Sequence, residues 1–129
     1  MDEIFARQAA LQSAYADKTK MLDPSTSLAN VGDALDYIKS MQSFANMELE
    51  ELLIEIGGST KALKPWSSEY GALRARQYSS TSTVRSEAID FLCFAINICL
   101  AAGVTKDNLS DEYAAVLSKN KARQLDASY

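Results

Sequence analysis

The sequence predicts an all-α protein that forms a single domain over residues 1–129. Three observations support this prediction. Only 2 residues are Pro and 5 are Gly, so few positions interrupt a helix. Apolar residues recur at helical spacing in several segments, above all in residues 28–56 and 87–102. The length of 129 residues is also close to the usual size of one domain, about 100 to 150 residues.

The composition excludes several classes of function. A net charge of −4 and a pI near 4.8 argue against a nonspecific nucleic-acid binder, which needs a basic face to displace counterions. The chain has no His, so His-based catalytic triads, HExxH zinc sites and His phosphorelays are excluded. The glycine-rich nucleotide-binding patterns GxxxxGKS/T and GxGxxG are missing as well. Chemistry in this chain therefore depends on carboxylates, bases and a metal ion.

The first predicted helix is amphipathic and covers residues 2 to about 22, ending before the Asp-Pro pair at 23–24. Gln8 and Gln12 lie one turn apart on it. They either present two amides to a ligand or face water, as polar side chains usually do.

Residues 28–56 predict a long second helix with an apolar stripe, ended by a Gly-Gly pair. Glu48, Glu51 and Glu55 share a face that borders this stripe, because they are spaced i, i+3 and i+7. No Lys or Arg lies among them, so their charges repel one another. The face is either a solvated acidic surface or part of a cation site.

Residues 57–82 form a connection that is rich in Gly, Ser and Thr, and we expect it to be mobile. Its basic residues, which would suit phosphate oxygens, are Lys61, Lys64, Arg74 and Arg76. Trp66, the only Trp, is either a core plug or a platform for a base.

The third long helix begins near residue 83 or 84 and ends at Gly103, and residues 88–102 are apolar nearly all round. Such a helix must be buried between neighbours, so we expect Asp90 to be buried too. A buried carboxylate must be protonated, paired or bound to a metal. Glu87 and Asp90 are three residues apart and therefore face the same way, so together they can bind one divalent cation.

Two simpler interpretations of Glu87 and Asp90 remain open at this point. The two acids are near the start of their helix, where negative charge complements the helix dipole. They are also candidates for salt bridges to Arg74, Arg76 or Arg85.

A last helix is predicted from a cap at residue 107 or 108 to about residue 124. It ends in KNKARQLDASY, whose bases Lys119, Lys121 and Arg123 either balance the helix dipole or clamp a phosphate.

Cys93 and Cys99 are six residues apart on one predicted helix, about 9 Å along its axis, which is too far for a disulfide. Free thiols fit a reducing cytoplasm. The N-terminus lacks an apolar signal core, and the run 88–102 is too short and too polar to span a membrane. We therefore expect a cytoplasmic protein.

The motifs ELEELLIE, KPWS, EAIDFLCF and YAAVLSKNKARQ follow one another in this order. This arrangement resembles the all-α nucleoside triphosphate pyrophosphatase (MazG-like) superfamily, most closely its dimeric dUTPase and dCTPase branch, which includes short phage members. The resemblance covers roughly residues 44–129 and is based on a split motif, ExxE followed by ExxD on a second helix. It implies a four-helix-type bundle, and a host-cytoplasm location if the protein is phage-encoded.

The resemblance also implies roles for individual residues. The metal ligands for Mg²⁺, with Mn²⁺ as an alternative, would be Glu48, Glu51, Glu87 and Asp90, with Glu55 as a further acid. Glu51 would be the catalytic residue that activates water. The phosphate-binding residues would be Lys64, Lys119, Asn120 and Arg123, and the base-binding residues Gln8, Gln12 and Trp66.

The sequence differs from this family pattern at Cys93, where many dUTPase-like members have His, and in the shorter spacing of its tail. The preferred base is therefore open among dUTP, dCTP and a purine dNTP. The apolar helix is too hydrophobic for a lone small bundle, so we expect a homodimer or homotetramer. The prediction is a Mg²⁺-dependent dNTP pyrophosphohydrolase for nucleotide-pool control. The alternative is a noncatalytic helical module that binds a partner protein through its acidic face.

Overall fold

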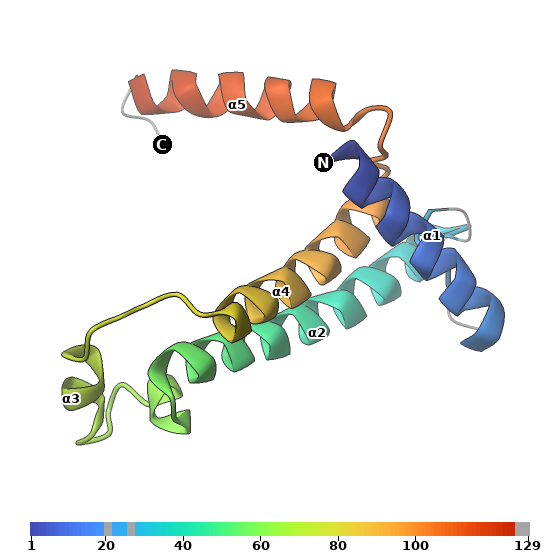
Figure 1. The fold of residues 1–129 in the computed structure, drawn as a ribbon. Helices are drawn as coiled ribbons and strands as arrows, with labels where there is room; N and C mark the ends of the chain where they lie inside the picture. The colour runs from blue at the N-terminus through green and yellow to red at the C-terminus, as the bar shows by residue number, and fades with distance from the viewer. Residues whose placement is uncertain (20–21, 26–27, 126–129) are drawn as a thin grey trace.

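The computed structural model describes residues 1–19, 22–25 and 28–125, and these residues fold into helices joined by short turns (Figure 1). The elements are α1 (Asp2–Thr19), α2 (Val31–Gly57), the 3₁₀ turn η1 (Thr60–Leu63), α3 (Tyr70–Arg74), α4 (Ser82–Ala101) and α5 (Leu109–Leu125). The described part of the chain contains no strand. The all-α prediction is therefore confirmed.

Local capping explains where the two longest helices begin and end. The side chain of Asn30 accepts a hydrogen bond from the backbone N–H of Asp33 and so caps the start of α2. Gly58 ends α2 in the left-handed conformation, with φ of 73°. Thr81 caps α4 by accepting from the N–H of Val84 at 3.1 Å. Caps therefore place these ends within about three residues of the predicted ones.

Helices α2 and α4 pack side by side in opposite directions and form the main body of the molecule (Figure 1). Their facing side chains show the register, because the rings of Phe44 and Phe94 stack with centroids 5.5 Å apart. Near the beginning of α2, the amide of Asn97 contacts the sulfur of Met41 at 3.7 Å. Helix α1 crosses the pair at this same end.

The hydrophobic core lies where α1 meets α4. Phe5, Ile96 and Leu100 are its buried members, and Val104 from the turn before α5 and Leu109 from the start of α5 pack against them. Each fully buried side chain of this size contributes about 1.5 to 3 kcal/mol. The core is therefore concentrated at one end of the α2–α4 pair.

Helix α5 runs away from the body and does not pack along α2 or α4 (Figure 1). Its apolar side chains Tyr113, Val116 and Leu117 are consequently exposed. The burial predicted for the apolar helix is wrong for this single chain: Ile89 is 55% exposed, and Asp90 is exposed as well. The reason is that neither α1 nor α5 covers this part of α4.

The connection at 57–82, which we expected to be mobile, includes the helical segments η1 and α3. Cys93 and Cys99 are free thiols, as their separation predicts. None of the described helices is long and apolar enough to cross a membrane.

Candidate metal centre

A cluster of acidic side chains lies between α2 and α4, about midway along the pair. Glu48, Glu87 and Asp90 each contribute a carboxylate oxygen, and these oxygens all lie within 4.8 Å of one another. Glu87 and Asp90 meet because residues three apart share one face of a helix. Glu48 joins them because the antiparallel register that stacks Phe44 on Phe94 brings the next turn of α2 opposite Asp90.

The electrostatics of the cluster are unfavourable without a cation. Burial raises the pKa of Glu48, and hydrogen bonding with Glu51 and the charges of Glu51, Asp90 and Glu87 raise it further. Burial also raises the pKa of Glu87, followed by the charges of Glu51 and Asp90 and by hydrogen bonding with Glu51. One oxygen each of Glu48 and Glu87, Oε2, is shielded from solvent and has no hydrogen-bond partner among the residues that the structure describes. The neighbouring acids thus oppose the ionisation of Glu48 and Glu87.

Neither simpler interpretation of Glu87 and Asp90 matches the geometry. The described ion pairs lie elsewhere in the molecule, and Arg85 donates to the hydroxyl of Ser80 instead of to an acid. The helix dipole acts mainly on charges in the first turn. Helix α4 begins at Ser82, so both acids lie beyond that turn. The donor set fits a hard divalent cation, since Mg²⁺, Mn²⁺ and Ca²⁺ prefer oxygen ligands and relieve the repulsion of grouped carboxylates.

Two further predicted acids flank this triad. Glu51 lies within hydrogen-bonding reach of both Glu48 and Glu87, so it belongs to the same cluster although it is outside the triad itself. Glu55 lies one turn farther along α2 and affects Glu87 through its charge alone. The geometry therefore distinguishes three close oxygen donors, one adjoining carboxylate and one more distant acid.

A cavity of about 320 Å³ opens in the same helix pair, on the side toward the core. Its lining residues are Leu11, Gln12, Tyr15, Met41, Phe44, Phe94 and Asn97. The lining residues of α4, Phe94 and Asn97, are four and seven residues beyond Asp90, so they lie about 6 and 10 Å along the helix axis from it. The lining is mainly apolar and aromatic with two amides, which is typical of a pocket for a small ring-containing ligand.

The predicted glutamines differ in how they meet this cavity. Gln12 lines it, whereas Gln8 is buried beneath it and donates through Nε2 to Oδ1 of Asn97 at 2.9 Å. Sequence reasoning missed Asn97 as a site residue. Its position as the one uncharged amide within the apolar run 88–102 was the available signal, because a buried amide requires a partner.

Comparison with protein-family models, with curated proteins and with solved structures found no match. What the chain does must therefore be inferred from its own residues and geometry.

The remaining predicted site residues lie away from the acids within one chain. Lys64 is exposed directly after η1, and Trp66 is 80% exposed in the following turn. Lys119, Asn120 and Arg123 are on α5, which extends away from the α2–α4 pair. A single chain thus gathers the acids and places Gln12 in the cavity on the same helix pair, but it brings neither the basic tail nor Trp66 to the acids.

Proposed function

We propose that this chain is a Mg²⁺-dependent nucleoside triphosphate pyrophosphohydrolase that converts a dNTP into a dNMP and pyrophosphate. The observation that supports it most is the arrangement of the α2–α4 pair. An acidic triad, in which Glu48 and Glu87 each have a shielded oxygen without a partner among the described residues, lies about 6 to 10 Å along the same helices from residues that line a ring-sized cavity. This separation suits a ligand with a base at one end and phosphates at the other.

The acids have distinct roles in this proposal. Glu48, Glu87 and Asp90 would hold Mg²⁺, which when bound neutralises phosphate charge and makes water more acidic. Glu51, beside the triad, accepts a proton from the attacking water. The water oxygen bonds to phosphorus, the bridging bond between the α and β phosphates breaks, and pyrophosphate leaves.

The cavity beside Gln12 and Asn97 is our candidate for the base pocket. Phe44 and Phe94 supply aromatic surface, and the amide of Gln12 supplies a donor and an acceptor for the edge of a base. Following the resemblance, dUTP or dCTP is the first substrate to test, with purine dNTPs as further candidates.

We further propose that a second copy of the chain completes a four-helix-type bundle, in a homodimer or homotetramer. Leu53 on α2, Ile89 on α4 and Val116 on α5 are all exposed in one chain. Exposed apolar surface on several helices is typical of an oligomer interface. In such an oligomer α5 of one protomer packs on the α2–α4 pair of its partner, and its Lys119 and Arg123 reach the partner's phosphates.

The decisive experiment is a screen of all nucleoside triphosphates for pyrophosphate release, with Mg²⁺ or Mn²⁺ and with EDTA as the metal-free control. Thermal melting with Mg²⁺ plus a nonhydrolysable dNTP provides an independent readout, because a ligand that binds the folded state raises the melting temperature. An enzyme shows both responses. Absence of both would favour the alternative, a noncatalytic interaction module with an acidic face.

A further inference from the structure

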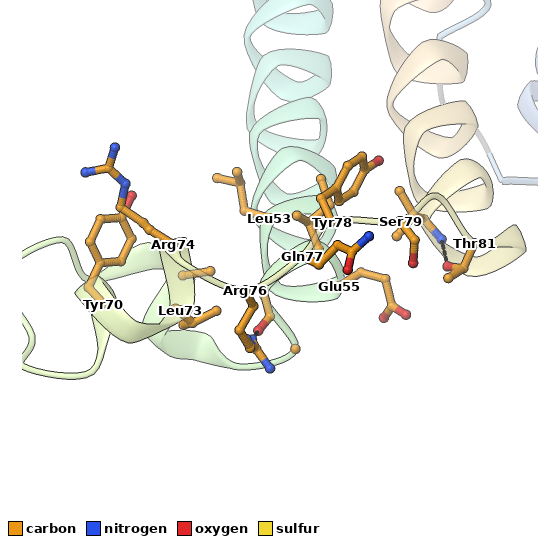
Figure 2. Close-up of a pocket in the computed structure, with 15 residues that line it drawn as sticks. Leu53, Glu55, Tyr70, Leu73, Arg74, Arg76, Gln77, Tyr78, Ser79 and Thr81 are labelled. Atoms are coloured by element: carbon orange, nitrogen blue, oxygen red, sulfur yellow. Dashed lines mark hydrogen bonds between the residues drawn. The ribbon is translucent and has the colours of Figure 1, made fainter.

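A second cavity, of about 470 Å³, lies at the opposite end of the helix pair, where α2 ends and α4 begins (Figure 2). Leu53 and Ile56 of α2 and Val84 of α4 contribute its apolar surface. The segment from α3 to the start of α4 supplies the other wall, with the polar side chains Tyr70, Arg74, Arg76, Gln77, Tyr78, Ser79 and Thr81. It therefore combines apolar and basic surface, unlike the cavity beside Asn97.

Two arginines give this cavity its positive charge. Arg76 turns back toward the end of α2 and donates through Nη2 to the backbone carbonyl of Gly57, whereas Arg74 extends outward from α3 (Figure 2). Among the ion pairs of the described residues, none involves either arginine. A guanidinium has five N–H donors, so the bond to Gly57 fixes Arg76 and leaves other donors for an anion.

The two cavities and the acids follow one another along α2 and α4. Asn97 and Met41 mark one end, Asp90 and Glu48 the middle, and Val84 the other end. Val84 is six residues before Asp90, about 9 Å along the helix axis. A ligand whose base lies beside Asn97 and whose phosphates reach the acids therefore points its far end toward this basic cavity.

We propose that the basic cavity receives the terminal phosphates of the triphosphate and holds the pyrophosphate product before release, with Arg76 as its main anion contact. This inference rests on the proposed function and adds a direction to it. Glu55, the one acidic residue that lines the cavity, lies at its border with the triad and repels an anion unless a cation lies between them. Arg74 and Arg76 offset that repulsion on the far side.

The beginning of α4 adds to the positive electrostatic potential of the cavity. Thr81 and Val84 both line the cavity, and the first turn of α4 contains no acidic residue. A helix N-terminus carries partial positive charge and free N–H groups, which favour a phosphate. The first turn of α4 thus adds a second positive element to the cavity, besides the two arginines.

Product inhibition distinguishes this cavity from the base pocket, because each product would occupy one of them. We would measure inhibition constants of pyrophosphate and of the dNMP for the wild type, Arg76→Ala and Arg74→Ala. Arg7→Ala is the matched control, since Arg7 pairs with Glu3 on the exposed face of α1. Arg76→Ala should raise the constant for pyrophosphate roughly 10- to 100-fold and change that for the dNMP by less than about twofold.

Arg74→Ala should raise the pyrophosphate constant by a smaller factor, and it leaves the bond to Gly57 intact, so it tests the cavity even where Arg76→Ala alters folding. Unchanged pyrophosphate inhibition in both variants, or equal rises for both products, would overturn the inference. Calorimetric titration with Mg²⁺-pyrophosphate separates it from the proposed function. The wild type could hydrolyse no triphosphate and still bind Mg²⁺-pyrophosphate, with this binding lost in Arg76→Ala. That result would support the anion site in the cavity and contradict the proposed enzymatic activity.

Discussion

The two halves of the α2–α4 pair belong to the same helices, but different side-chain interactions dominate in each. In the half next to α1, Ile96 and Leu100 are buried against Phe5, and the Gln8 amide donates a hydrogen bond to the Asn97 amide, which in turn contacts the sulfur of Met41. In the other half, carboxylates meet carboxylates. Their shielded oxygens have no hydrogen-bond partner in the described structure.

This difference separates what stabilises the fold from what the fold is used for. Burial of apolar side chains and satisfied amides favours folding at the first half. At the second half, grouped negative charges oppose folding, since the neighbouring acids disfavour the ionised forms of Glu48 and Glu87. An arrangement that costs stability and that a cation would relieve is expected of a binding site, and the following experiments test this division.

The largest effect is expected from the acidic half. Glu51→Gln should lower turnover at least about 100-fold, because the activated water contributes several kcal/mol to transition-state stabilisation. The melting temperature of the metal-free variant should stay the same or rise, since one repelling charge is removed. Steady-state pyrophosphate release and thermal melting in EDTA measure the two effects.

The neighbouring residue on α2 provides the control for Glu51. Glu50→Gln removes the same charge from an exposed position that is not part of the cluster, so it should leave turnover unchanged. If Glu51→Gln instead unfolded the protein while the folded fraction kept its activity, the acidic half would be structural.

The apolar half should respond in the opposite way. Ile96→Ala should lower the free energy of unfolding by about 2 to 4 kcal/mol, because it leaves a cavity beside Phe5 and Leu100. Ile89→Ala on the same helix removes an exposed side chain and should cost less than about 0.5 kcal/mol in dilute protein. Urea denaturation of both variants measures the difference, and equal costs would show that the two halves of α4 are equally buried.

The sequence predicted the elements of the fold better than their assembly. Caps and periodicity depend on residues close in the chain, so the helices at 2–19, 31–57, 82–101 and 109–125 lie near their predicted positions. Whether a helix is covered depends on distant segments. The apolar composition of residues 88–102 therefore indicated burial that one chain does not provide around Ile89 and Asp90.

The candidate site was predicted in part for the same reason. The spacing of Glu87 and Asp90 fixes their common face, and the pattern of acids on residues 48–55 supplied the facing helix. The register that makes Glu48 the third close donor depends on packing such as the Phe44–Phe94 stack, which spacing alone does not determine. The bases Arg74 and Arg76 indicated phosphate contacts from the sequence alone, but the cavity that they line forms only where the connection packs onto the end of α2, which local patterns do not determine.

A smaller effect tests whether α5 serves the acidic half of a partner. Arg123→Ala should lower turnover about 10- to 100-fold, as expected for loss of a charge-assisted contact. Mixing it with Glu51→Gln should restore about a quarter of wild-type activity, because half of a two-fold symmetric mixture is heterodimer with one intact site. Lys18→Ala, at the exposed end of α1, is the control and should change nothing. Activity that stays at the sum of the two parents would show that the tail does not act across an interface.

The smallest effect concerns pH, and it measures the repulsion in the acidic half directly. The pKa values of Glu48 and Glu87 are raised above the ordinary 4.5 in the folded protein, so the folded state binds protons there more tightly than the unfolded state does. Each group therefore destabilises the metal-free protein at neutral pH, and the penalty fades as the pH falls through the raised pKa toward 4.5. Glu48→Gln lacks this penalty. In EDTA it should melt above the wild type at pH 7, with the gap narrowing as the pH falls toward 4.5, whereas Mg²⁺ should raise the melting temperature of the wild type alone. A gap that is independent of pH would mean that the Glu48 carboxylate is not held against its neighbours, and the acidic half would then be an ordinary solvated surface.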